Sequence, residues 1–87
     1  MGRWADARDL AQDCLNRRRR ILGEDHPSTL GSASNLAVVL RALGDVQAAR
    51  DLHQDTLDRM RRVLGPDHPD TLASANNLRL LGEADTP

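Results

Sequence analysis

The feature that most restricts the fold of this chain is an internal duplication. When the sequence is shifted by 42 residues, Gly2–Leu36 aligns with Gly44–Leu78 without a gap, and 22 of the 35 aligned pairs are identical. The triplet Asp25–Pro27 matches Asp67–Pro69 residue for residue. Chance identity would cover only a few positions, so the chain is predicted to repeat one structural unit.

The apolar residues of each unit recur at intervals of three and four, which is the spacing of one helix face. In the second unit they stand at Val46, Ala49, Leu52, Leu57, Met60 and Leu64, and in the first at Trp4, Ala7, Leu10, Leu15 and Leu22. The strict alternation of apolar and polar residues that marks a strand does not occur in the sequence. An all-α fold is therefore expected.

Glycine and proline mark where the helices end and begin. Gly23 and Gly65 follow the two long segments, where a residue in the left-handed conformation commonly ends a helix. Pro27 and Pro69 suit the first turn of the next helix, and Asp45 is the expected N-cap of the third. These signals predict four helices near residues 3–22, 27–43, 45–64 and 69–81, joined by short loops that make neighbouring helices antiparallel.

Several of these segments resemble a known family. The runs Asn35–Leu40 and Gly44–Val46, and above all Leu64–Thr71, which reads Leu-Gly-Pro-Asp-His-Pro-Asp-Thr, are similar to the 42-residue tetratricopeptide repeats of kinesin light chains and of many actinobacterial multidomain proteins. Leu40 and Val46 stand where those repeats usually carry tyrosine. The resemblance covers nearly the whole chain. It implies antiparallel helical hairpins stacked as a tetratricopeptide-type fragment of a right-handed solenoid.

The register of the repeat divides the expected domain, residues 1–82, into three parts. They are a half-repeat at 2–26, a full hairpin at 27–68 and a truncated half-repeat at 69–82, followed by a polar tail at 83–87. Repeat proteins usually need about three units to bury a continuous core. Both ends are therefore expected to associate with another surface, and the candidate residues for self-association are Trp4, Leu78 and Leu81.

The composition indicates the cellular setting. All 12 basic residues are arginine, a bias that high-GC bacterial genomes produce. The N-terminus carries Asp6 where a signal peptide needs an apolar run. The single cysteine cannot form an internal disulfide, and no stretch has the apolar length of a membrane span. A cytoplasmic protein without membrane contact is expected.

The two Asp-His-Pro triplets are the clearest candidates for chemistry. A histidine beside an aspartate, such as His26 or His68, can act as a metal ligand or a base. A catalytic group is needed once, however, and these triplets recur at the repeat period. That recurrence favours a tight corner between hairpins, in which Asp or His caps the following helix.

Two other reactive side chains align with packed positions of the repeat. His53 aligns with Ala11, and Cys14 aligns with Thr56 on the apolar stripe. Both are expected to fill space on the buried face. The sequence contains no glycine-rich phosphate loop, no Gly-x-Ser-x-Gly and no paired metal-ligand spacing. No enzyme activity, catalytic residue, metal or cofactor is therefore expected.

An arginine run at residues 17–20, echoed by Arg59, Arg61 and Arg62, is the feature that could indicate nucleic-acid binding. The run lies in the last turns of a helix, where cations oppose the negative end of the helix dipole. Acidic residues such as Asp55 and Asp58 share the same segments and would repel phosphates. No nucleic-acid partner is expected.

The resemblance also implies a binding face, because the first helices of tetratricopeptide hairpins line a concave groove. The residues that this places on the concave face are Gly31, Ser34, Asn35, Val38, Arg41, Ala73, Asn76, Asn77 and Leu80. Asn35 and Asn77 match the asparagine of the family, whose amide offers donors and an acceptor to a peptide backbone. Arg41 can pair with a carboxylate on the partner. The alternative is that the asparagines are solvated or bond a neighbouring turn.

Three functions follow as hypotheses. The first is a scaffold module that binds a peptide or protein through its concave face. The second is a self-assembling structural unit, a homo-oligomer in which the incomplete terminal repeats pair with a second copy to form a dimer. The third, by analogy with the family alone, is a regulatory segment of a larger multidomain protein or a longer repeat array.

Overall fold

The computed structural model describes the backbone of residues 2–84 and the side chains of residues 3–81. Its elements are α1 (Gly2–Leu22), α2 (Pro27–Ala42), α3 (Val46–Val63) and α4 (Pro69–Ala84). The predicted all-α fold with four helices is confirmed. The last helix differs most from its predicted bounds, because α4 continues to Ala84 and so takes in the first two residues assigned to the polar tail. The rest of that tail, residues 85–87, lies outside the described residues.

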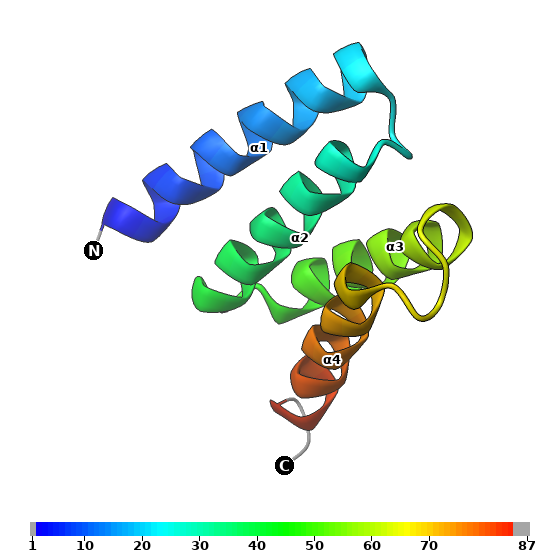
Figure 1. Cartoon of the computed structure of the whole chain (residues 1–87). Coiled ribbons are helices and arrows are strands. Elements are labelled where there is room, and N and C mark those ends of the chain that lie inside the picture. Colours follow the sequence, from blue (N-terminus) through cyan, green and yellow to red (C-terminus); the bar gives the residue numbers. More distant parts are fainter. Residues whose placement is uncertain (1, 85–87) are drawn as a thin grey trace.

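The helices stack in the order of the sequence (Figure 1). α2 packs against both α1 and α3, and α4 packs against α3. The resulting arrangement is flat, measuring 34 × 31 × 17 Å. Successive antiparallel neighbours are what short loops of three to five residues impose, and they agree with a fragment of a helical-repeat protein.

The corners between hairpins are built twice in the same way. Gly23 and Gly65 have φ values of +92° and +97°, the left-handed conformation that ends the preceding helix. His26 Nδ1 accepts a hydrogen bond from the backbone N–H of Ser28 at 3.1 Å, and His68 Nδ1 accepts one from Asp70 at 3.1 Å. Both histidines therefore cap the following helix, which confirms the structural interpretation of the Asp-His-Pro triplets.

The N-cap of α3 is only partly as predicted. Asp45 does occupy the N-cap position, but its side chain makes no capping hydrogen bond. Its carbonyl oxygen accepts the backbone N–H of Ala49 at 3.1 Å, so the residue begins the helix through its backbone. The turn before it is closed by Gly44, whose φ of +88° is again left-handed.

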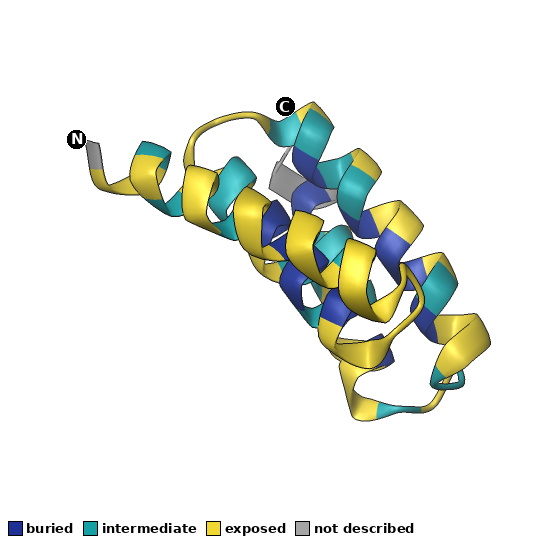
Figure 2. Cartoon of the chain, turned by 90° about the horizontal axis from the view of Figure 1, so that it is seen from above, coloured by how far each residue is buried: buried dark blue, intermediate teal, exposed yellow. Residues whose placement is uncertain are grey.

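The core lies where α2 meets its two neighbours. Leu15, Ala33 and Leu36 form a buried cluster, with Leu40 and Leu52 among the half-buried residues packed against it. Figure 2 shows the buried residues along the inner faces of the stack and the largely exposed surface of α1. The expectation for His53 is confirmed, because its side chain is 1% exposed.

Two expectations about burial are wrong, and both concern the ends of the stack. Cys14 is exposed, although the aligned Thr56 is buried. The reason is that α3 lies between α2 and α4, whereas α1 has only α2 against it. Leu81 was predicted to take part in self-association, which requires exposure, but it is fully buried, since α4 packs against α3. Leu78 is half-buried and Trp4 remains 50% exposed.

Candidate functional site

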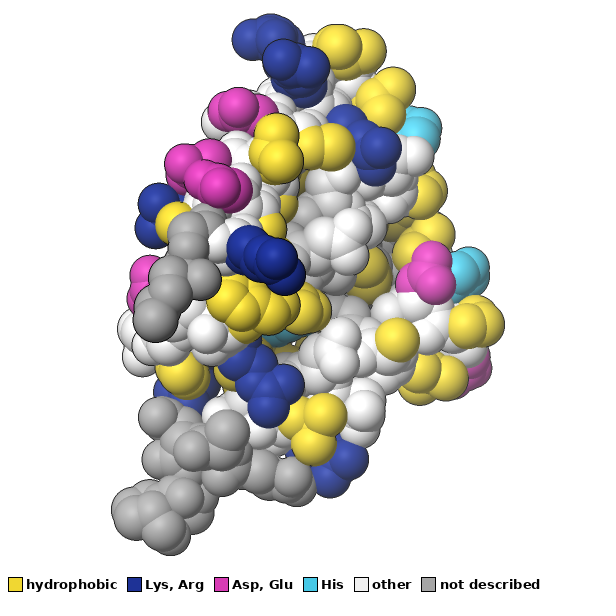
Figure 3. Space-filling model, turned by 90° about the vertical axis from the view of Figure 1, so that its left-hand side faces the viewer, with side chains coloured by type: hydrophobic (Ala, Val, Ile, Leu, Met, Phe, Trp, Pro, Cys, Tyr) yellow, Lys and Arg dark blue, Asp and Glu magenta, His cyan; other side chains and the backbone are white. Residues whose placement is uncertain are grey.

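A groove of about 220 Å³ is the main recess between the repeats. α2 and α4 form its walls, which are equivalent helices of consecutive units, and Met60 of α3 contributes to its lining. Figure 3 shows a hollow on this side of the molecule, bordered mainly by uncharged and hydrophobic side chains. The lining residues are Gly31, Ser34, Asn35, Met60, Asp70, Ala73, Ser74 and Asn77.

Two asparagines at the same position of the repeat face this groove. Asn35 comes from α2 and Asn77 from α4, exactly one repeat length of 42 residues apart. Within the described part of the chain neither amide is engaged in a hydrogen bond. The hydroxyl oxygens of Ser34 and Ser74 also lack a hydrogen-bond partner there. The groove therefore carries several polar groups that are not committed to holding the fold together.

The structure brings together five of the nine residues predicted for the concave face. Ser34, Asn35, Ala73 and Asn77 line the groove together with Gly31. The other predicted residues, Val38, Arg41, Asn76 and Leu80, do not line it. They lie further along α2 and α4 or on a neighbouring side of each helix.

Three lining residues were not predicted: Met60, Asp70 and Ser74. Met60 was missed because the face was assigned from first helices alone, whereas this residue belongs to the last turn of α3. Asp70 and Ser74 each lie three residues before a predicted position on the same helix, Ala73 and Asn77 respectively. The three-and-four periodicity that located the apolar stripe could have found both.

Charge in the groove comes from one side chain. Asp70 is the sole charged residue among those lining it. Arg41, which was predicted to bind a partner carboxylate, is exposed on α2, and that prediction stands. Burial lowers the pKa of His53, and the positive charge of Arg41 lowers it further. His53 Nδ1 is buried without a hydrogen-bond partner in the described residues.

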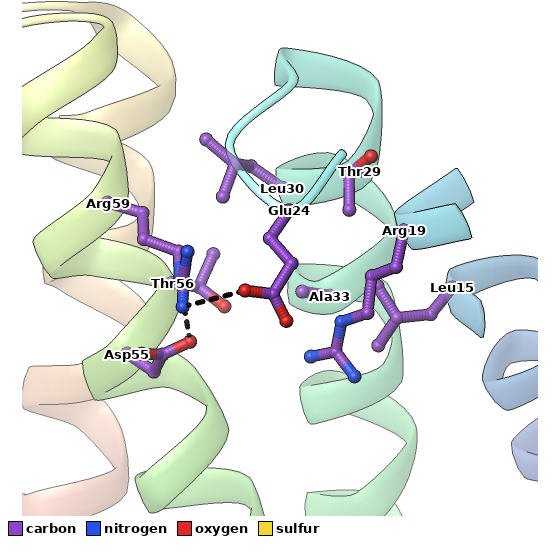
Figure 4. Close-up of a pocket in the computed structure, with 9 residues that line it drawn as sticks. All are labelled: Leu15, Arg19, Glu24, Thr29, Leu30, Ala33, Asp55, Thr56 and Arg59. Carbon is purple, nitrogen blue, oxygen red and sulfur yellow. Dashed lines mark hydrogen bonds and ion pairs between the residues drawn. The ribbon is translucent and has the colours of Figure 1, made fainter. Parts of the chain in front are cut away.

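An arginine-centred cluster joins α3 to the corner between α1 and α2 (Figure 4). Arg59 Nε donates to Asp55 Oδ2 at 3.0 Å, and Nη2 lies 3.3 Å from Glu24 Oε2. Arg59 Nη1 also donates to Asp25 Oδ1 at 2.8 Å. Arg62 Nη2 adds a second hydrogen bond to Asp25 at 3.0 Å. Hydrogen bonding to Arg59 lowers the pKa of Asp25, and the same bond raises the pKa of Arg59.

This cluster orients the second unit on the first rather than performing chemistry. Its carboxylates are at least half exposed, so each pair contributes little by itself, and the network gains mainly from sharing one arginine. The small cavity beside it is lined by Leu15, Leu30, Ala33 and Thr56 as well as by members of the cluster. Its volume is about 10 Å³, room for no more than a water molecule.

The arginine run at the end of α1 is also partly used inside the chain. Arg18 Nη1 donates to the carbonyl oxygen of Ser28 at 3.0 Å, tying α1 to the first turn of α2. Among the described residues, no three His, Cys, Asp or Glu side chains are grouped closely enough to hold a metal ion. None of the described helices combines the length and the apolar character needed to cross a membrane.

Comparison with known proteins agrees with the repeat geometry. The sequence model described as tetratricopeptide repeat matches residues 1–28 and 29–70, most of the chain. No curated protein matches the sequence significantly. Repeats of this family are non-enzymatic scaffolds that generally mediate protein–protein interaction. The more specific resemblance to the repeats of kinesin light chains stays a prediction. Paired helices at a 42-residue period, identical capped corners and the family match lead to one conclusion: the chain belongs to the tetratricopeptide repeat family.

Proposed function

We propose that the groove between α2 and α4 binds an extended segment of a partner protein. The observation that carries this proposal is the pair of uncommitted amides, Asn35 and Asn77, which line one groove from equivalent positions of two units. Each amide can donate to a backbone carbonyl and accept from a backbone N–H. An extended peptide presents such groups repeatedly along its length, so the two amides can bind it at two points.

The shape of the groove supports a peptide rather than a cofactor. Small-molecule sites are typically enclosed recesses of about 300–1,000 Å³, whereas this one is open and measures about 220 Å³. Gly31 and Ala73 are small, so the backbone of a ligand can approach both helices closely. Asp70 adds one negative charge. The preferred ligand therefore has a lysine or arginine near the residue that lies beside α4.

A peptide selected from a random display library provides the test. Peptides are selected for binding to the wild-type chain alone, and the affinity of the best one for the wild type and for the Asn35→Ala/Asn77→Ala variant is measured by fluorescence anisotropy. The double variant is expected to bind it at least about tenfold more weakly, because two amide contacts are lost. Asn76→Ala is the matched control, since Asn76 is adjacent to Asn77 but does not line the groove.

Two results would contradict the proposal. One is equal affinity of the wild type and the double variant for every selected peptide. The other is a selected peptide that perturbs the amide NMR signals of α1 but leaves those of Gly31, Ala73 and Ser74 unchanged. Circular dichroism of both variants checks that the helices are intact.

Self-association is the second candidate function. Leu10 on α1 and Leu72 on α4 are 71% and 55% exposed, a large apolar exposure for such a small chain. Both lie on the outermost helices of the stack. Covering these two surfaces with a second copy of the chain would bury them without any peptide ligand.

A further inference from the structure

The two outermost surfaces of the stack are incomplete copies of one internal interface. Leu30 on α2 is 1% exposed because α3 covers it, whereas its repeat equivalent on α4, Leu72, is 55% exposed. On the other side, Leu52 of α3 packs against the core cluster, whereas its equivalent on α1, Leu10, is 71% exposed. α4 therefore resembles an α2 helix on which no α3 helix is packed. In the same way, α1 resembles an α3 helix on which no α2 helix is packed.

The internal α2–α3 interface provides the geometry of a completed copy. There, Leu30 lines the small cavity together with Asp55, Thr56 and Arg59 (Figure 4). At the same interface, Asp25 accepts hydrogen bonds from Arg59 and Arg62 at 2.8 and 3.0 Å. An apolar contact and a carboxylate between two arginines thus hold α3 against α2 and against the corner that precedes α2.

Shifting these residues by one repeat length places all their equivalents on the exposed surfaces. On α4 and the corner before it, Leu72 replaces Leu30 and Asp67 replaces Asp25. The equivalents on α1 of Asp55, Thr56, Arg59 and Arg62 are Asp13, Cys14, Arg17 and Arg20.

The first three of these α1 residues, together with Leu10 and Arg18, line a hollow of about 330 Å³ on the outside of the helix. Within the part of the chain that the structure describes, Asp67, Arg17 and Arg20 make no ion pair. The hollow with Arg17 and Arg20 lies at one end of the stack, and Leu72 with Asp67 lies at the other. These two surfaces correspond to the two sides of the internal contact.

We propose that α4 of one copy docks against α1 of a second copy, head to tail, and continues the stack across chains. Leu72 enters the hollow beside Cys14, and Asp67 accepts hydrogen bonds from Arg17 and Arg20. This inference rests on self-association, the second candidate function, and is independent of peptide binding in the groove. Because the two surfaces differ, the contact is heterologous and does not close at a dimer.

The occupant is a second copy because one chain carries both halves of the contact. The acidic corner at Asp67 complements the basic end of α1, as Asp25 complements Arg59 and Arg62. The match is not perfect. Arg79 stands at the position of Ala37. Pro66 replaces Glu24, so the ion pair between Glu24 and Arg59 at the internal interface has no equivalent in the proposed contact. The intermolecular contact is therefore weaker than the internal one and depends on protein concentration.

A pair of complementary variants tests the arrangement by mass. Leu10→Asp blocks the α1 surface and Leu72→Asp blocks the α4 surface, and both side chains are exposed, so the fold is retained. Light scattering is expected to give a wild-type mass that rises with concentration beyond a dimer. Each variant alone should remain a monomer of 9.6 kDa. An equimolar mixture should give a heterodimer of twice that mass and nothing larger, since one intact surface of each kind remains.

The outcomes of this experiment separate the two levels of the proposal. A wild-type chain that is monomeric at every concentration would overturn self-association and the head-to-tail contact together. A Leu72→Asp variant that still dimerises alone would overturn the head-to-tail contact only, because it would show symmetric pairing through α1. Peptide binding in the groove would be unaffected by either result.

Oxidative cross-linking tests the predicted neighbour of Leu72. A Leu72→Cys variant treated with copper phenanthroline should form disulfides between the new cysteine and Cys14 of the next copy, giving a ladder of multimers on a non-reducing gel. Ala73→Cys is the matched control, because Ala73 lines the groove instead. Removing the native thiol with Cys14→Ser should abolish the ladder. Ladders of equal yield from Leu72→Cys and Ala73→Cys would overturn the proposed contact.

Discussion

Arg59 of α3 donates a 2.8 Å hydrogen bond to Asp25 in the corner between α1 and α2, and these two residues lie 34 positions apart in the chain. The contact links one unit to the next through side chains that the repeat supplies in every copy. Asp67 is the repeat equivalent of Asp25, but it lies in a different environment, because it has no such partner among the described residues.

Removing the carboxylate of Asp25 is expected to lower the thermal unfolding midpoint in dilute buffer. In Asp25→Asn an amide oxygen remains to accept hydrogen bonds, but Arg59 and Arg62 would lose the negative charge that they share. The difference from the wild type should shrink in about 1 M NaCl, where the screening length falls to about 3 Å. Asp67→Asn is the control and should leave the midpoint of the monomer unchanged. Equal effects of both substitutions would contradict the role assigned to the Arg59 cluster.

The two equivalent leucines should respond very differently to truncation. Leu30→Ala removes a side chain that is 1% exposed and should lower the free energy of unfolding by about 2–5 kcal/mol. Leu72→Ala removes one that is 55% exposed, and the change should stay within about 0.5 kcal/mol. Urea unfolding followed by circular dichroism, at a dilution where the chain is monomeric, measures both. Similar losses would mean that α4 is covered in the monomer.

His53 should make stability depend on pH below neutrality. Its pKa in the folded chain is below the ordinary value of 6.5, so the unfolded chain binds more protons as the pH falls through that value. The free energy of unfolding should therefore decrease from pH 7 to pH 5. Urea unfolding midpoints at a series of pH values measure this slope.

The control for the pH dependence is His53→Leu, which removes both the titration and the unpartnered Nδ1. In this variant the slope between pH 7 and pH 5 should flatten. The remaining acid sensitivity should appear below about pH 4, where Asp25 begins to bind protons in the unfolded chain. An unchanged slope in His53→Leu would assign the pH dependence to other groups.

Two glycines should respond to alanine with opposite signs. Gly31 lies inside α2, and a Cβ there would meet nothing within 4 Å, so Gly31→Ala should stabilise the chain by about 0.5–1 kcal/mol. Gly23 has a φ of +92°, so Gly23→Ala should destabilise it by about 1–2 kcal/mol. Chemical unfolding measures both changes. Gly31→Ala should also weaken binding of a groove peptide, because the added methyl group narrows the lining.

The sequence was sufficient to predict the features that the repeat unit specifies by itself. The positions of the four helices follow from apolar spacing together with glycine and proline, and the histidine caps follow from the recurrence of the Asp-His-Pro triplet. The prediction that Asn35 and Asn77 share one groove came from the resemblance to tetratricopeptide repeats, whose first helices line a concave face, and both residues line the same groove in the structure.

The features that depend on neighbouring helices were not predictable in the same way. Cys14 and Thr56 have the same place in the repeat, yet only Thr56 is covered on both sides, so alignment alone assigned the wrong burial to Cys14. Leu81 showed the reverse, since the sequence does not reveal that α3 covers the end of α4. The pairing of Arg59 with Asp25 also needed the three-dimensional structure, because several other carboxylates lie nearer in the chain.

The stacking of α1 to α4 in sequence order also governs how such a chain can fold and change in length. Its principal helix contacts join neighbours along the chain, and local contacts of this kind are associated with rapid folding because little loop entropy is lost before they form. Stability then approximates a sum of unit and nearest-neighbour contributions. A recombination event that inserted or deleted one 42-residue unit would preserve every surviving junction, so the gene can vary the span of the scaffold without redesigning its core.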